Sequence, residues 1–145
     1  MSEKAWRVEA RIGKTLETAV TMGRHSMCAD EPERLGGSDA GPNPYDLVLA
    51  ALATCTLMTI RIVADKRDIP LEAAEVRLAY REVPPEEREE DEDGRTPRED
   101  RIDMHVRLEG DFDEKQRKRL HKAAGQCPVH KTYDHGIDVV THFDD

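Results

Sequence analysis

Two cysteines, Cys55 and Cys127, occupy the settings of this chain that are best suited to chemistry. Cys55 lies in an almost uninterrupted apolar run, residues 47–64, and Cys127 opens the string Cys127-Pro128-Val129-His130-Lys131. The two thiols are far apart in sequence, but a fold can bring them together. A pair of thiols at one site performs peroxide reduction, disulfide exchange or metal binding. Deciding among these chemistries decides the function.

Taken alone, Cys55 can be interpreted as an unreactive thiol. Burial in an apolar helix makes a thiol a small hydrophobic residue, because it disfavours the thiolate. Cys55 lies about 11 residues, or roughly 16 Å at the standard helical rise, beyond Pro44. The helix dipole acts only within the first turn. A cation or hydrogen-bond donor from another segment must therefore stabilise a Cys55 thiolate, and Arg24 and His25, after Gly23, are the most suggestive cation source.

Cys127 has a more favourable local setting, since Pro128 predicts a helix start with Cys127 at the N-cap. At that position its sulfur can accept backbone N–H groups, which favours the thiolate, and His130 and Lys131 add donors or positive charge within one turn. The alternative is a cysteine that only caps the helix. We interpret Cys28 as a spare thiol. Zinc binding by Cys28, Cys127, His130 and His135 has no second paired motif behind it, so we predict no metal and no cofactor.

Composition limits the classes of function. A chain of 145 residues is expected to form one domain. Its formal net charge of -9 disfavours a nucleic-acid partner, which needs a basic face. The apolar run contains three threonines and Arg61, so we expect it to be too polar and too short to span a membrane. The odd count of 3 cysteines and the absence of a visible secretory signal predict a cytoplasmic protein with reduced thiols.

Periodicity predicts the elements that must position the thiols. Alternating residues predict strands at 5–12, 16–22, 25–29, 76–80, 102–108 and 137–143. Asn43-Pro44 predicts the start of a helix that runs to about residue 67 and is apolar on nearly every face. A second helix is expected at 113–125, capped by Asp111 or Asp113. Residues 30–41 are expected to be irregular, and 84–100 to form a mobile loop.

This order of elements predicts an α+β fold, with antiparallel sheets around a long buried central helix. A helix that is apolar all round needs cover on every side, and a sheet covers only one side. We therefore expect an intertwined homodimer in which a second copy of the chain supplies the remaining cover.

The chain resembles the OsmC-like and organic hydroperoxide resistance proteins over nearly its whole length. The resemblance rests on four strings: Gly36-Gly37-Ser38-Asp39-Ala40-Gly41-Pro42-Asn43-Pro44-Tyr45-Asp46-Leu47, Leu49-Ala50-Ala51-Leu52-Ala53-Thr54-Cys55-Thr56, Gly110-Asp111 and Cys127-Pro128-Val129-His130. It implies a single OsmC-like domain at 1–145 and a swapped homodimer with two identical sites. It also implies a thiol-dependent peroxidase for organic hydroperoxides, restored by a cellular dithiol that is lipoylated in some relatives.

By this likeness Cys55 is the peroxidatic thiol, Cys127 is the resolving thiol and Arg24 holds the thiolate. Further residues are expected around the thiolate and substrate: His25, Tyr45, Asp46, Met58, Thr59 and His130. The family often has a glutamate where this chain has Tyr45. Asp46 lies one residue later, about 100° around the helix, and need not point the same way. The alternative function is a redox-sensing or small-molecule-binding module whose disulfide forms slowly, with little turnover.

Overall fold

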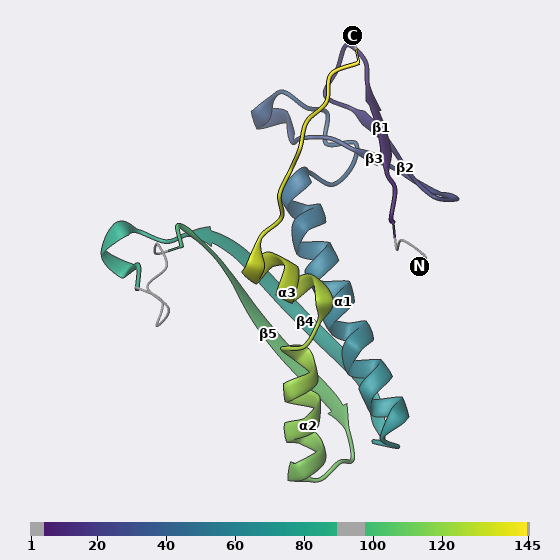
Figure 1. The fold of residues 1–145 in the computed structure, drawn as a ribbon, viewed down its shortest axis with the longest axis vertical. Coiled ribbons are helices and arrows are strands. Elements are labelled where there is room, and N and C mark those ends of the chain that lie inside the picture. The colour runs from purple at the N-terminus through teal and green to yellow at the C-terminus, as the bar shows by residue number, and fades with distance from the viewer. Residues whose placement is uncertain (1–4, 90–97, 145) are drawn as a thin grey trace. The chain divides into compact units, whose positions relative to one another are not determined.

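The computed structural model describes residues 5–89 and 98–144 and forms two compact units, residues 1–48 and 49–145 (Figure 1). The long helix α1 crosses the boundary between them. The architecture is α+β with antiparallel sheets, as expected from the sequence. In chain order the helices and strands are β1 (Glu9–Ile12), β2 (Thr18–Met22), β3 (His25–Ala29), α1 (Pro44–Lys66), β4 (Leu71–Glu82), β5 (Asp100–Gly110), α2 (Glu114–Ala124) and α3 (Pro128–His135).

The first unit contains a three-stranded antiparallel sheet in the order β1-β2-β3. Strand β3 has the predicted bounds, and β2 begins two residues later than expected because Leu16 and Glu17 precede the ladder. Strand β1 is shorter than predicted and begins at Glu9, opposite Thr21. The strand pattern around Trp6 and Val8 therefore has no partner within this sheet.

The loop between β3 and α1 is organised by the carboxylate of Asp30, which is only 3% exposed. Asp30 accepts the backbone N–H groups of Glu31 at 2.8 Å, Ser38 at 3.0 Å and Ala40 at 3.1 Å. The loop packs closely, since a Cβ on Gly41 would collide with the carbonyl group of Cys28. The expectation of a fully irregular loop was wrong in one place, because Glu33–Leu35 forms a 3-10 turn.

Helix α1 begins with the cap that the sequence predicts. The Asn43 side chain accepts the Asp46 N–H at 2.9 Å, and the Asp46 carboxylate accepts the Asn43 N–H at 3.0 Å, so the two form a reciprocal capping box. The helix spans 23 residues and contains a window with a mean hydropathy of 2.1, which is long and apolar enough to cross a membrane by length and composition alone. This corrects the expectation that the run is too short and too polar. The core helix of a globular fold passes the same test.

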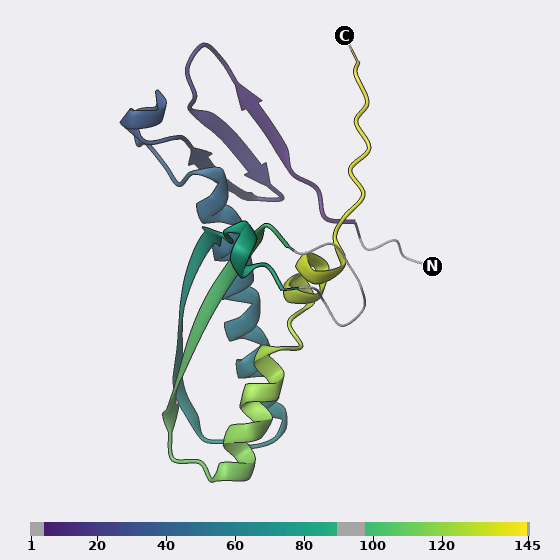
Figure 2. The ribbon, with the colours of Figure 1, turned by 90° about the vertical axis from the view of Figure 1, so that its left-hand side faces the viewer.

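The second unit has its core between α1, the β4–β5 hairpin and α2, as Figures 1 and 2 show. One stripe of α1 is buried, with Ile60 and Ala64 both 0% exposed, because i and i+4 positions share a helix face. Opposite it lie Leu120 and Ala123 of α2 and Leu71 at the start of β4. The central helix is therefore buried along one stripe rather than on every face.

The β4–β5 hairpin is longer than the sequence predicts. Its antiparallel register runs from Leu71 opposite Gly110 to Glu82 opposite Asp100, with an irregularity between Leu71 and Ala73. Part of the expected loop at 84–100 lies outside the described residues. The described part contains a hydrogen bond from the Val83 N–H to the Glu99 carbonyl at 2.6 Å, and residues Pro85–Glu87 form a 3-10 turn. The mobility of this loop stays a prediction.

Helix α3 follows α2 closely in the sequence, and three residues separate them: Gly125, Gln126 and Cys127. Asp113 caps α2 in a capping box with Gln116, and Pro128 opens α3, as predicted. The predicted strand at 137–143 was wrong, since these residues form no regular element. No strand pairs with this segment within residues 5–89 and 98–144. Its large apolar side chains are exposed: Ile137, Val139, Val140 and Phe143.

Candidate thiol site

Helices α1 and α3 bring Cys55 and Cys127 into contact, although 72 positions separate them in the sequence. The two side chains lie within hydrogen-bond range of each other, and no disulfide joins them. Cys127 is fully buried and Cys55 is partly buried. The juxtaposition that the chemistry of a thiol pair requires is therefore present in the fold of a single unit.

The groups around Cys55 have opposing effects on the pKa of its thiol. Burial is the largest effect and raises the pKa of Cys55 above its ordinary value, and contact with Cys127 raises it further. The backbone N–H of Val129 and the hydroxyl of Thr59 oppose this, because hydrogen bonds to the sulfur favour the thiolate. The balance leaves the pKa of Cys55 raised, so this environment keeps the thiol protonated.

Cys127 holds the N-cap position of α3, as predicted, but the expectation that its sulfur caps the helix was wrong. Its side chain makes no capping hydrogen bond. The N–H of Val129, in the first turn of α3, lies instead against the sulfur of Cys55. A helix start leaves backbone N–H groups unpaired, so α3 offers Cys55 the terminus that α1 cannot supply.

Two predicted neighbours, Thr59 and His130, lie on the elements that meet at the thiols. The Thr59 hydroxyl also bonds to the Cys55 carbonyl at 2.7 Å, which holds the side chain one turn along α1. The Nε2 atom of His130 lies 3.6 Å from a carboxylate oxygen of Asp134. Buried polar atoms without a hydrogen-bond partner among the described residues are Thr56 Oγ1 and His130 Nδ1.

Within the described part of the second unit, no contact places the remaining predicted residues beside the two thiols. Arg24 and His25 belong to the first unit, and their role beside the thiolate stays a prediction. The carboxylate of Asp46 is engaged in the cap of α1. Tyr45 is 58% exposed and Met58 is 63% exposed, so both present much of their surface outward.

Sequence reasoning missed two groups beside the thiols. The sequence names no acceptor for the Val129 N–H, because only tertiary packing decides which sulfur reaches a helix start. Tyr133, which follows Cys127 on α3, was not singled out. Burial raises the pKa of Tyr133, and the charge of Cys127 adds to this effect. Its spacing gave no signal, because six residues turn an α-helix by about 600°, which leaves Tyr133 roughly 120° away from Cys127 around the helix.

Cys28 is exposed in strand β3, where its sulfur lies 3.6 Å from the Ala29 carbonyl oxygen. Within the described ranges 5–89 and 98–144, no group of three or more His, Cys, Asp or Glu side chains is arranged to hold a metal ion. The zinc set considered from the sequence is therefore not assembled there.

The sequence profile of the family described as OsmC-like protein matches residues 36–142, which include both thiols. No protein with a curated description matches the chain. Solved structures do resemble it. An OsmC-like protein from Mycoplasma pneumoniae superposes with a TM-score of 0.70 and 18% identity, covering 92% of this chain and 89% of that chain.

Two further structures share the fold. A putative osmotic stress induced and detoxification response protein from Psychrobacter arcticus has a TM-score of 0.67 and 20% identity, over 86% of this chain and 85% of that chain. An organic hydroperoxide resistance protein OsmC from Legionella pneumophila has a TM-score of 0.62 and 20% identity, over 91% and 90%. The profile match covers well over half of the sequence, and this chain belongs to the OsmC-like family.

Proposed function

We propose that this protein is a cofactor-free thiol peroxidase that reduces organic hydroperoxides in the cytoplasm. The contact between Cys55 and Cys127 carries the proposal, because a resolving thiol must approach the oxidised one closely enough to form a bond. Membership of a family with hydroperoxide resistance proteins among its structural relatives supports a role in peroxide defence.

In the proposed cycle the Cys55 thiolate attacks the O–O bond of the hydroperoxide. The alcohol leaves with a proton, and Cys55 becomes a sulfenic acid. The thiol of Cys127 then displaces the sulfenic hydroxyl as water, and a Cys55–Cys127 disulfide forms. A dithiol reductant, such as a lipoylated protein, returns both residues to thiols by exchange.

Ionisation is the step that needs help, because burial raises the pKa of Cys55 in the second unit. The Val129 N–H lies at the sulfur, and the Thr59 hydroxyl, which also donates to the Cys55 carbonyl at 2.7 Å, lies beside it; both lower the pKa of Cys55. A guanidinium is the further group that would favour the thiolate most, and we assign that role to Arg24 on the family likeness. His25 and Tyr45 belong to the same proposed environment.

The first test measures consumption of an alkyl hydroperoxide with a dithiol reductant. We expect turnover in the wild type and its loss in Cys55→Ser, whereas Cys28→Ser, which changes a thiol outside the pair, retains turnover. Trapping with a sulfenic-acid probe should label Cys55 in the Cys127→Ser variant. Consumption no faster than in a thiol-free blank, or a sulfenic acid found only on Cys127, would contradict the assignment.

A redox-sensing module is the second candidate, and the raised pKa of Cys55 is the observation that favours it. A thiol that stays protonated reacts slowly, so the disulfide would form once per oxidative event rather than in each cycle. Disulfide formation under oxidant, without steady turnover in the presence of reductant, would select this function over the peroxidase.

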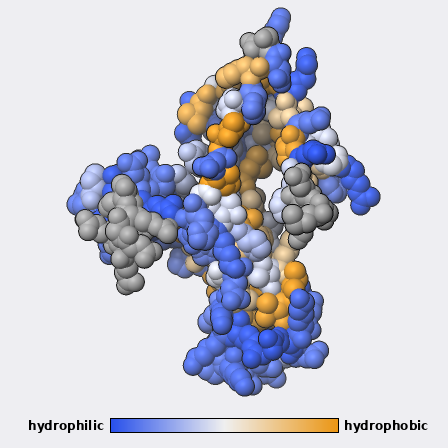
Figure 3. Space-filling model, viewed as in Figure 1, coloured by the Kyte–Doolittle hydropathy of each residue, from blue (hydrophilic) through white to orange (hydrophobic). Residues whose placement is uncertain are grey.

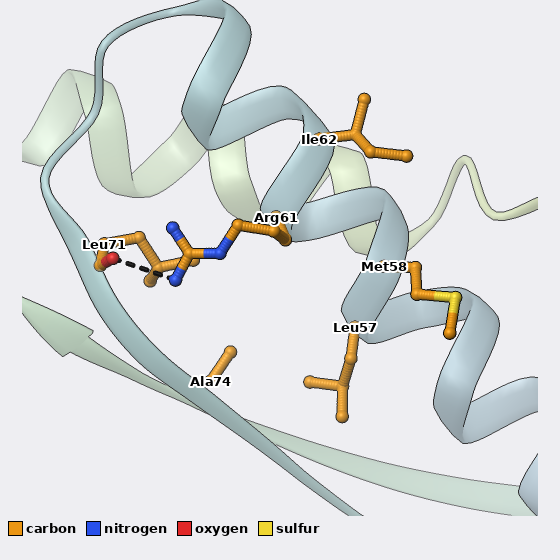
Figure 4. A pocket seen from close by; sticks show the side chains of 6 residues that line it. All are labelled: Leu57, Met58, Arg61, Ile62, Leu71 and Ala74. Carbon is orange, nitrogen blue, oxygen red and sulfur yellow. Dashed lines mark hydrogen bonds between the residues drawn. The ribbon is translucent and has the colours of Figure 1, made fainter.

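We also propose that the protein acts as a homodimer. The outer face of α1 carries apolar side chains that the unit leaves open, with Met58 63% and Ile62 53% exposed. They line a groove of about 420 Å³ with side chains of α1 and β4, and Figure 4 shows them around it: Leu57, Met58, Arg61, Ile62, Leu71 and Ala74. Apolar surface also stays open on the face of the molecule seen in Figure 3. A second copy would cover such a surface.

A further inference from the structure

The side chain of His130 has one paired and one unpaired nitrogen. Its Nε2 lies 3.6 Å from the Asp134 carboxylate, one helical turn further along α3. Its Nδ1 is buried and has no hydrogen-bond partner within residues 5–89 and 98–144. A carboxylate beside one imidazole nitrogen favours the hydrogen on that nitrogen, so the lone pair lies on the other. In His130 the lone pair is thus on the buried Nδ1.

The position of His130 on α3 relates this lone pair to the thiols. His130 follows Cys127 by three residues, and residues three apart lie on the same face of a helix. This face is only partly turned inward, because Cys127 is 0% exposed whereas the side chain of His130 is 39% exposed. The residue between them in this turn, Val129, has its N–H against the Cys55 sulfur. Cys127, Val129 and His130 therefore belong to the first turn of α3, and this turn contacts Cys55 of α1.

An unpaired buried polar atom is costly, so a native fold that retains one usually has a use for it. Thr56, the residue after Cys55, has a second such atom, its Oγ1, and is 0% exposed. Threonines in these helices otherwise bond back to their own helix, as Thr54 does to Ala50 and Thr132 does to Pro128. Both α1 and α3 thus retain one buried polar atom without a partner among the described residues.

We propose that His130, oriented by Asp134, carries the proton in the step that joins the two thiols, an inference that rests on the proposed peroxidase function. Among the described residues no sulfur lies within hydrogen-bond range of Nδ1, so the imidazole must first turn toward Cys127. Its Nδ1 atom then takes the hydrogen from the Cys127 thiol as that sulfur attacks the sulfenic sulfur of Cys55. The S–O bond breaks, and the same proton returns from Nδ1 to the departing hydroxide. One thiol and one sulfenic acid give one disulfide and one water, and the imidazole ends the step unchanged.

The neighbouring groups fit this role less well. Burial, together with the charge of Cys127, raises the pKa of Tyr133, so the phenol keeps its proton and is a poor acceptor. Lys131 is exposed on α3, and an ammonium has no lone pair to offer. Imidazole takes up and releases a proton near neutral pH, which is what a reversible transfer needs.

The test separates the two chemical steps in a Cys28→Ser background after mixing with tert-butyl hydroperoxide. Rapid quenching and mass spectrometry give the rate of sulfenic acid formation on Cys55 and the rate of disulfide formation. We expect His130→Gln to form sulfenic acid at the wild-type rate and the disulfide about 10²-fold more slowly, the usual contribution of a positioned acid or base. Asp134→Asn should slow only the disulfide step, by a smaller factor.

Two further variants distinguish a chemical role of His130 from a structural one. Added imidazole should restore disulfide formation in His130→Gly, an effect that a structural role would not produce. His135→Gln changes an exposed histidine of the same helix and should leave both rates unchanged.

Three results would overturn the inference. If His130→Gln and Asp134→Asn both form the disulfide at the wild-type rate, the inference fails while the peroxidase proposal stands. If His130→Gln slows both steps equally and imidazole restores neither, the histidine supports only the fold. If the wild type forms no sulfenic acid on Cys55, the peroxidase proposal fails and this inference fails with it.

Discussion

At the scale of single residues, Cys55 is held between influences that oppose each other. Burial and the second sulfur hold the proton on the thiol, whereas a backbone N–H and a hydroxyl favour its release. The donors come from two elements, Val129 of α3 and Thr59 of α1 itself. A small change at either donor should therefore shift the ionisation of Cys55, and the hydroxyl can be removed without altering the backbone.

Thr59→Val tests this balance. The hydroxyl lowers the pKa of Cys55, so its removal should raise that pKa and reduce the thiolate fraction at any given pH. We expect the pH midpoint for alkylation of Cys55, followed by mass spectrometry of its peptide, to move upward. Thr54→Val is the matched control, because its hydroxyl bonds to the Ala50 carbonyl at 2.8 Å and is not among the groups that shift Cys55. Equal midpoints in the two variants would contradict the assignment.

At the scale of elements, the loop before α1 depends on one carboxylate. Asp30 accepts three backbone N–H groups, and these bonds lower its pKa. Such bonds stabilise the fold only while the carboxylate is charged. The stabilisation is fully present above the pKa that Asp30 has in the unfolded chain, and it is lost as the pH falls through the lower pKa of the folded state.

Asp30→Asn should therefore lower the midpoint of thermal unfolding near neutral pH, and its difference from the wild type should shrink as the pH falls below the folded-state pKa of Asp30. An amide keeps one acceptor but loses the charge that strengthens all three bonds. Glu33→Gln serves as the control, since Glu33 is an exposed acid of the same loop. A difference between Asp30→Asn and the wild type that stays constant down to acid pH would show that the charge of Asp30 plays no part.

The elements that could be predicted from the sequence are those whose signal is local. The cap at Asn43, the start at Pro128 and the alternation of β3 depend on neighbours within a few residues, and the structure confirms them. The strand at 137–143 failed because alternation shows that a segment can pair, without showing what it pairs with. The acceptor of the Val129 N–H could not be predicted for the same reason, since it is a sulfur of α1.

At the scale of the whole molecule, the central helix leaves an apolar face open. The apolar run predicts cover on every side of α1, whereas the second unit buries only one stripe: Leu52, Thr56, Ile60 and Ala64. Within the groove beside α1, the guanidinium of Arg61 donates to the Leu71 carbonyl at 2.9 Å and pairs with Asp65 at 3.3 Å. The one charged group of the groove thus has partners in the same unit, which leaves the apolar side chains available to a second copy.

Ile62→Glu tests the proposed dimer. A carboxylate at this half-exposed position leaves the core of the unit unchanged but would be buried without a partner in an interface across α1. We expect light scattering after size exclusion to give a dimer for the wild type and a monomer for Ile62→Glu. Lys118→Glu, on the exposed face of α2, should remain a dimer. A wild-type monomer, or an Ile62→Glu dimer of unchanged stability, would contradict the proposal.

The placement of Cys28 gives the protein a built-in reference for its redox state. Cys28 lies in β3, outside the set of groups that shift Cys55, and the chain has 3 cysteines. A disulfide between Cys55 and Cys127 would therefore leave one alkylatable thiol in every chain, whatever the extent of oxidation of the pair. The label on Cys28 measures how much protein is present, and the label on the other two reports what fraction is reduced. Both quantities can be obtained from the same digest, so the oxidation state can be followed in crude extracts without a separate measurement of protein concentration.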